Sequence, residues 1–132
     1  MTTATTPIPT IAVFPEEKLT LSEKIEKWVW QLCRSLEGNY ELRYPNSDHA
    51  PKFRMEFGRK YIKVIQQDLR NDEYRDGSVH AFIDRNTGEV YKPASWKSPA
   101  KIVRYDLRLI AHRAKLHDPN YTDWAGGYLY LR

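Results

Sequence analysis

An amphipathic segment near the N-terminus constrains the fold of this chain more than any other feature of the sequence. Thr20 and Glu23 have the spacing of a capping box, which begins a helix, and Gly38 supplies a stop signal. Apolar side chains recur at helical spacing between these points: Leu21, Ile25, Trp28, Val29, Leu32 and Leu36. Because so wide an apolar stripe has to be buried against a sheet or another helix, we predict a long helix that covers the core.

Two stretches of alternating apolar and polar residues follow this helix. Phe53, Met55 and Phe57 alternate with charged residues, and residues 60–65 continue after a short turn as a second strand. Residues 78–91 repeat the arrangement around a turn that ends in glycine. Two consecutive hairpins predict an α+β fold, with an antiparallel sheet of about four strands and the helix laid across one face.

The alternation also assigns side chains to faces of the sheet. Val79, Ala81 and Ile83 are expected on one face, and His80, Phe82 and Asp84 on the other. Polar residues 39–51 and 66–77 are predicted as connections, with a short extended piece at 40–44.

Length and composition indicate one domain. A chain of 132 residues with 41% hydrophobic residues has room for a single core, which we assign to residues 16–132. Three prolines in residues 1–15 predict an extended N-terminal arm. No apolar run approaches the roughly 20 residues that span a bilayer, and the start lacks signal-peptide features, so we expect a cytoplasmic protein without membrane contact.

Helix signals return downstream of Pro93. Ser98 is a suitable N-cap and Pro99 suits the first helical position, so a second, basic helix is predicted near the C-terminus. Asp106 offers an alternative start for that helix. Residues 128–131 are aromatic and aliphatic, which favours a last short strand.

The positive charge of the chain is concentrated in this region. The net charge is +4, and residues 92–115 hold seven Lys and Arg residues against one acidic residue, Asp106. On a continuous helix, one face would carry Lys97, Lys101, Arg104, Arg108, His112 and Lys115. Such a stripe is suited to phosphates and predicts nucleic-acid binding, although a solvated helix face has the same pattern.

The candidate nucleic-acid-binding residues are Lys92, Lys97, Lys101, Arg104, Arg108 and Lys115, with Tyr91 and Trp96 for base stacking. The alternative role for Trp96 is a core plug at the corner between strand and helix.

A protein-interaction module is the alternative function, with a host bacterial protein as its partner. Its contacts would be apolar residues of the two ends: Ile8, Ile11, Val13 and Phe14 in the arm, and Trp124, Tyr128 and Tyr130 in the tail. Self-association through the same ends is a further alternative, because an unpaired edge strand accepts a partner.

Chemistry is weakly specified by the sequence. His49, His80, His112 and His117 form no metal-binding motif, and a lone Cys33, expected half-buried on the first helix, excludes a multi-cysteine zinc site. The chain has neither a glycine-rich phosphate loop nor a nucleophile elbow. We therefore expect a noncatalytic protein without metal or cofactor.

An alternative prediction is a hydrolase that uses one set of residues for general acid/base catalysis. His80 and Asp84 would share a strand face with Lys92 across the hairpin.

The segment from Val79 to Lys101 has a distinctive sequence, VHAFIDRNTGEVYKPASWKSPAK, and the distinctive stretch continues to Leu107. It resembles a recurrent module of small uncharacterised proteins of tailed bacteriophages, in which a hairpin return is followed by Lys-x-Ala-Ser-Trp-Lys-x-Pro-Ala-Lys. The match covers about a quarter of the chain. The resemblance implies a phage origin and expression in a bacterial cytoplasm, and it brings no catalytic residues.

Overall fold

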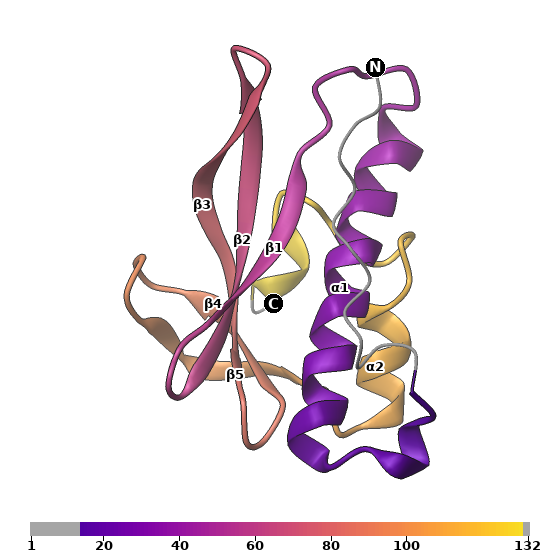
Figure 1. Ribbon diagram of the computed structural model, residues 1–132, viewed down its shortest axis with the longest axis vertical. Coiled ribbons are helices and arrows are strands. Elements are labelled where there is room, and N and C mark those ends of the chain that lie inside the picture. The colour runs from indigo at the N-terminus through magenta and orange to yellow at the C-terminus, as the bar shows by residue number, and fades with distance from the viewer. Residues whose placement is uncertain (1–13, 131–132) are drawn as a thin grey trace.

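One antiparallel sheet and one long helix make up most of the fold (Figure 1). The computed structural model describes residues 14–130. The elements in chain order are η2 (Glu16–Lys18), α1 (Leu21–Arg43), β1 (Lys52–Phe57), β2 (Tyr61–Arg70), β3 (Glu73–Asp84), β4 (Glu89–Pro93), β5 (Pro99–Asp106), α2 (Ile110–Leu116) and η3 (Gly127–Leu129). The strands lie side by side in the order β1-β2-β3-β4-β5. The α+β class is confirmed, and the sheet has five strands rather than four.

Helix α1 begins where its capping box predicts. The Thr20 hydroxyl accepts a hydrogen bond from the Glu23 amide at 3.2 Å, and the Thr20 amide donates to the Glu23 carboxylate at 2.9 Å. The helix passes Gly38 and ends at Arg43, so the extended piece expected at 40–44 is wrong. Gly38 serves close packing instead of termination, because a Cβ there would lie 3.3 Å from the Pro119 ring.

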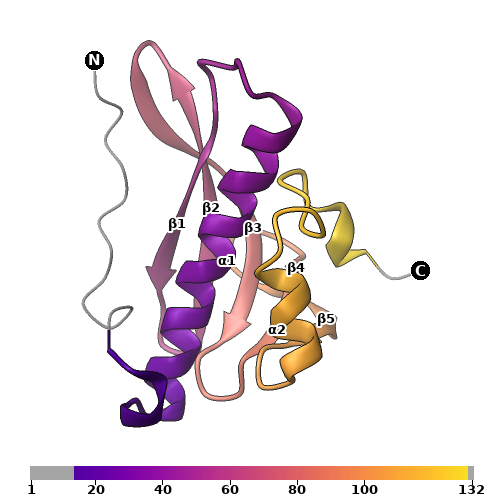
Figure 2. The ribbon, with the colours of Figure 1, turned by 90° about the vertical axis from the view of Figure 1, so that its right-hand side faces the viewer.

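The core forms between the apolar stripe of α1 and the inner face of the sheet (Figure 2). Its helix side includes Ile25, Val29 and Leu32, and its sheet side includes Phe53 and Ile62, all fully buried. Cys33 joins them at 1% exposure, so it is more deeply buried than the sequence suggested. Burial raises the pKa of its thiol to about 12.

Strands β2 and β3 form a longer hairpin than predicted. Residues 66–77 are strand rather than connection, except for a tight turn at Asn71 and Asp72. These two residues have φ values of 50° and 65°, which Asn and Asp tolerate better than most residues and which suit a two-residue hairpin turn. The polar sequence concealed the hairpin, whose strands are joined by polar side-chain pairs such as Gln67, which donates a hydrogen bond to the Asp76 carboxylate at 3.0 Å.

A bulge in β3 changes the predicted faces of the sheet. Val64 pairs with Ala81 and Ile65 with Val79, so His80 is the extra residue between them. Ala81 belongs to the main core but Val79 does not. His80 turns inward instead, and its ring meets the Phe53 ring edge-on at 5.3 Å.

The helix expected from Pro99 is wrong, because residues 99–106 form strand β5. Ser95 and Ser98 close the loop before it: the amides of Ala94 and Ser95 both donate to the Ser98 carbonyl. Proline is tolerated on an edge strand, and the β-branched pair after Lys101 favours strand over helix.

A second helix does lie near the C-terminus, but it is short. Helix α2 starts at Ile110, four residues after Asp106, and has no side-chain cap. The last strand expected at 128–131 is also wrong: η3 occupies part of this stretch, and residue 131 lies outside the described residues.

Two side chains of α1 hold the edge strand β1 through its backbone. The Phe53 amide donates to the Glu37 carboxylate at 2.8 Å, and Arg34 donates to the Phe53 carbonyl at 3.1 Å. Arg34 and Glu37 also form an ion pair at 3.0 Å. Burial is the main reason that the pKa of Glu37 is raised, and its hydrogen bond from Phe53 opposes that shift.

Replacing Glu37 with Gln should destabilise the fold by about 1–3 kcal/mol, because Arg34 loses its counter-charge and the Phe53 amide a charge-assisted acceptor. The free energy of unfolding in urea measures this change. Glu41→Gln, at an exposed position of the same helix, is the matched control and should change stability by less than about 0.5 kcal/mol. Equal effects of the two variants would contradict the role given to Glu37.

Candidate functional site

The predicted cationic stripe is divided among several elements. Lys92 lies on β4, Lys97 in the loop before β5, Lys101 and Arg104 on β5, Arg108 before α2 and Lys115 on α2. No single helix face carries them. The stripe as a continuous helical surface is therefore wrong, since it depended on a helix that starts at Pro99.

Four of these six cations already have partners within the fold. Arg108 forms an ion pair with Asp106 at 2.7 Å, and Arg104 donates to the Leu129 carbonyl at 2.7 Å. Lys92 and Lys115 lie over the rings of Tyr130 and Tyr121, respectively.

Lys97 and Lys101 differ from the other four. Both are exposed, and their ammonium groups make no hydrogen bond or ion pair with any residue in the range 14–130. They are therefore the members of the predicted set that are most available to a polyanion.

A second group of cations and aromatic residues adjoins them, and sequence reasoning missed it. Lys60 lies over the Tyr61 ring at 5.4 Å, and Tyr61 meets the rings of Phe82 and Tyr91 edge-on. Lys63 lies over the Phe82 ring at 5.6 Å. These contacts connect the start of β2 to β3 and β4.

Trp96 completes this arrangement from the loop between β4 and β5. Its side chain is 46% exposed, so the core-plug alternative is wrong. Its backbone carbonyl accepts a hydrogen bond from Lys63, which ties the loop to β2. The Ser95 hydroxyl also accepts from the amides of Lys97 and Ser98. The indole is thus exposed on a loop whose backbone is held in place.

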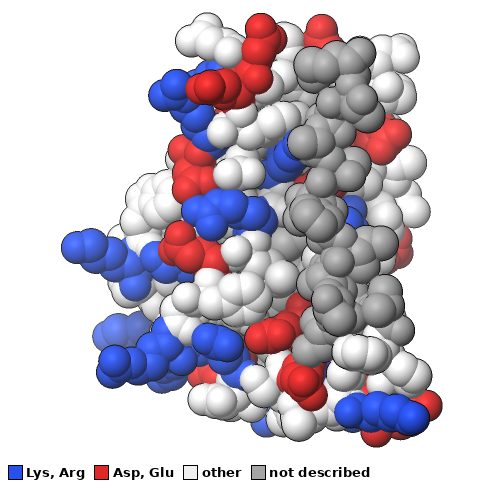
Figure 3. Space-filling view, viewed as in Figure 1, with Lys and Arg blue, Asp and Glu red and all other residues white. Residues whose placement is uncertain are grey.

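The two contributing segments share a charge pattern. Residues 57–67 contain three cations and residues 90–105 contain four, and neither segment contains Asp or Glu. Figure 3 shows Lys and Arg side chains gathered over the β1–β2 turn and beside the β4–β5 loop. We call this region the basic surface and define it by Arg59, Lys60, Tyr61, Tyr91, Trp96, Lys97 and Lys101. The missed signal was the run of three cations around Tyr61.

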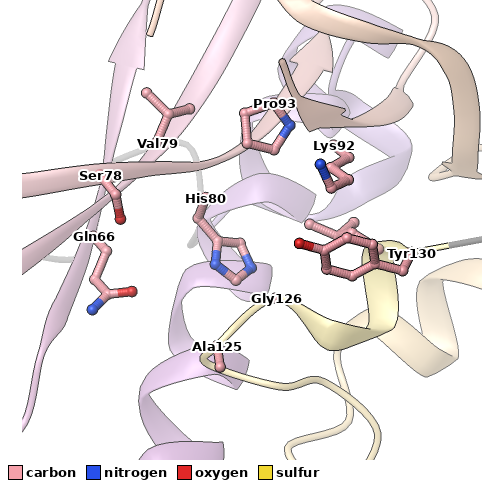
Figure 4. Close-up of a pocket in the computed structure, with 10 residues that line it drawn as sticks. Gln66, Ser78, Val79, His80, Lys92, Pro93, Ala125, Gly126 and Tyr130 are labelled. Carbon is pink, nitrogen blue, oxygen red and sulfur yellow. The ribbon is translucent and has the colours of Figure 1, made fainter. Parts of the chain in front are cut away.

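A small pocket lies beside β4. Figure 4 shows its lining residues, which come from β2, β3, β4 and the C-terminal segment. His80 is 7% exposed, and its Nε2 atom is hydrogen-bonded to the Tyr128 hydroxyl at 2.7 Å. Burial lowers the pKa of His80 to about 4, although the negative charge of Asp123 opposes that shift. The imidazole is therefore neutral at pH 7.

The acid/base set of the hydrolase alternative is only partly assembled. His80 and Lys92 line the same pocket, but Asp84 does not. The Asp84 carboxylate accepts hydrogen bonds from the amides of Asn86 and Thr87, which fixes the β3–β4 turn. Asp84 thus has a structural role, and the geometry does not join it to His80 as an acid/base pair.

The apolar residues predicted to form a protein-binding surface differ in exposure where the structure describes them. Ile8, Ile11 and Val13 lie outside the described residues, and Phe14 is 50% exposed. In the tail, Trp124 packs partly buried against the core and Tyr128 is 9% exposed, whereas Tyr130 is 59% exposed.

The described residues contain neither a metal-ligand cluster nor a membrane-spanning helix. Among residues 14–130, no group of three His, Cys, Asp or Glu side chains is arranged to hold a metal ion. Within the same range, no helix has both the length and the apolar character needed to cross a bilayer.

A family model matches residues 12–131 of the chain. The chain belongs to DUF7717, a family of unknown function. No curated protein and no solved structure matches it. The DUF7717 match includes the basic surface and the pocket beside β4, so both lie in the part of the chain that the family shares.

The buried His80 predicts a loss of stability in acid. Between pH 6.5 and about 4 the unfolded chain binds a proton at this position and the folded chain does not, so stability falls as pH decreases through that range. His80→Gln should remove this dependence. Between pH 7 and pH 4, the free energy of unfolding should fall by about 3 kcal/mol more in the natural chain than in the variant.

Urea unfolding at a series of pH values measures this difference, and every other titrating group is common to the two proteins. Parallel pH profiles would contradict the assignment of a neutral, buried His80.

Proposed function

We propose that this protein binds single-stranded nucleic acid on the basic surface, without catalysing a reaction. The observation that carries the proposal is the exposed Trp96 of the β4–β5 loop, followed by the exposed Lys97 and, on β5, the exposed Lys101. Neither lysine has an acidic partner among residues 14–130. Proteins that bind single strands combine cations that follow the phosphates with aromatic rings that stack on bases. Tyr61 and Tyr91, partly exposed on the same sheet face, supply further rings.

A single strand fits this surface better than a duplex does. Unpaired bases can lie flat on aromatic side chains of a sheet, whereas a duplex is usually read by a helix in its major groove. Helix α2 has seven residues, and the cations before it are bound to Asp106 and to backbone carbonyls. The geometry therefore favours stacking on the sheet over groove insertion.

The biological setting belongs to the same proposal. The resemblance of residues 79–107 to a phage module suggests a small accessory protein that acts in the cytoplasm of an infected bacterium. Single-stranded DNA and RNA are both present there, and the basic surface has no feature that distinguishes the two sugars.

Reversing the charge of Lys97 and Lys101 tests the proposal. We expect the natural chain to bind a fluorescently labelled single-stranded oligonucleotide with a slope of log K against log salt of about −3, which corresponds to four phosphate contacts. Lys97→Glu combined with Lys101→Glu should weaken binding at least tenfold and make the slope shallower by about 1.4. Fluorescence anisotropy across a salt series measures both quantities.

The matched control is Lys18→Glu combined with Lys24→Glu, which makes the same change of net charge. These residues lie in η2 and at the start of α1, across the molecule from the β4–β5 loop (Figure 1). It should bind like the natural chain. Trp96→Ala should weaken binding by about 1–3 kcal/mol with no change of salt slope, because stacking carries no counterion release. Equal losses in both charge variants would show nonspecific attraction and would overturn the proposal.

A second candidate function, binding of a partner protein, rests on the open edge of the sheet. Strand β5 is an edge strand, and its Ile102 and Val103 are 56% and 37% exposed. Lys101 beside them has no acidic neighbour within residues 90–105, so an extended segment of alternating acidic and aliphatic residues would match both charge and shape.

A labelled peptide of alternating Glu and Val tests this candidate. It should bind the natural chain at micromolar concentration, and Ile102→Arg should weaken binding at least fivefold, whereas Leu42→Arg, an exposed leucine on α1, should not. Failure of the peptide to bind would leave nucleic acid as the ligand that the structure supports.

A further inference from the structure

The pocket beside β4 has a defined size and position. It has a volume of about 180 Å³ and lies between strands β3 and β4 and the segment that follows Trp124. This volume equals that of about six water molecules in the liquid. It is therefore too small for a nucleotide but large enough for one tetrahedral oxyanion with some of its water.

The lining of the pocket carries one charged side chain, and it is a cation. Among its ten lining residues, Lys92 is the one cation and there is no Asp or Glu. The ammonium group lies over the Tyr130 ring, 4.8 Å from its centre, which leaves the charge without an anionic partner in the range 14–130. A cation held in a recess without a carboxylate attracts an anion.

Polar groups converge beside Lys92. The Tyr130 hydroxyl and the Lys92 amine both point toward the His80 ring (Figure 4). The Nε2 atom of His80 is occupied by Tyr128, and its Nδ1 atom has no hydrogen-bond partner among the described residues. Ser78 and Gln66 line the opposite side. With the Tyr128 hydroxyl as donor to Nε2, the neutral imidazole carries its proton on Nδ1. This N–H and the Tyr130 hydroxyl are then donors that suit the oxygens of an anion.

The charged groups around this recess have both signs. Arg104 approaches from β5 through its bond to the Leu129 carbonyl. Asp123 acts on His80 through its negative charge but does not line the pocket. Tyr128 has a raised pKa because of burial and therefore stays neutral. Asp68 is a second carboxylate near the pocket, because it accepts a hydrogen bond from the lining residue Gln66 at 2.9 Å. Lys92 is therefore distinguished as the one charged side chain that lines the pocket, not by an excess of cations around it.

We propose that this pocket binds a single phosphate group, held by Lys92, Tyr130 and His80. The group would be either free phosphate or the terminal phosphate of a nucleic-acid strand. The proposal does not depend on the basic surface. A strand that crosses that surface could place its end here, because Tyr91 and Lys92 are neighbours on β4.

Titration with inorganic phosphate, followed by two-dimensional NMR of the full chain, tests the pocket directly. We expect saturable shifts of the Ser78, His80 and Gly126 amides with a dissociation constant of about 1 mM. Lys92→Met keeps an aliphatic chain over Tyr130 but removes the charge, and it should weaken binding at least tenfold. Lys24→Met, on α1 and outside both the pocket and the basic surface, is the matched control and should leave the constant unchanged.

Tyr130→Phe is a second variant, which removes only a hydroxyl from an exposed side chain and is expected to fold. It should weaken phosphate binding about threefold. If the pocket amides do not shift at tens of millimolar phosphate, or if Lys24→Met has the same effect as Lys92→Met, the proposal is wrong.

Two oligonucleotides of one sequence, with a 5′-phosphate and with a 5′-hydroxyl, distinguish the sources of the group. Tighter binding of the phosphorylated strand that disappears in Lys92→Met would identify a strand end. Equal binding of both strands, together with pocket shifts from inorganic phosphate, would identify free phosphate. Loss of all oligonucleotide binding with retained phosphate binding would overturn the function proposed for the basic surface and leave the pocket intact.

Discussion

Burial of the apolar stripe of α1 against the inner face of the sheet is the contact on which the other features depend. It fixes which face of each strand is covered, because neighbouring residues of a strand point to opposite sides. Arg34 and Glu37 fix the position of β1 against the helix, because they bind the backbone carbonyl and amide of Phe53. The uncovered face is then left for Tyr61, Tyr91 and the cations beside them.

The same helix makes the two edges of the sheet unequal. Strand β1 is held under α1 by its backbone, so its edge is poorly placed to pair with another chain. Strand β5 has no such cover, and its aliphatic residues are exposed next to Lys101. The surfaces proposed for nucleic-acid binding and for partner binding therefore both lie at the β4–β5 end of the molecule.

Local signals predicted those parts of the fold that local interactions determine. The Thr20 capping box and the Gly88 turn, where φ is 79°, stand where the sequence placed them. The strand at 99–106 was missed because its cations recur at helical spacing by coincidence, and pairing with β4 overrides that period. The His80 bulge has no signal in a single strand, since it is defined by the register of its partner.

The candidate site shows the same division. The concentration of cations in residues 92–115 led to the selection of Trp96, Lys97 and Lys101 as candidate binding residues. No such local signal identifies Lys63, which lies beside Trp96 only because β2 and the β4–β5 loop meet in three dimensions.

Burial of Cys33 gives the chain a built-in reporter. Its thiol is the single one in the sequence, is 1% exposed and has a pKa raised to about 12. The thiolate of an accessible cysteine attacks a sulfur atom of a disulfide reagent and displaces the other, so the folded chain is unreactive while α1 stays packed on the sheet. The rate at which this one sulfur is labelled in native buffer therefore counts the openings of the helix from the sheet, without any probe having to be introduced.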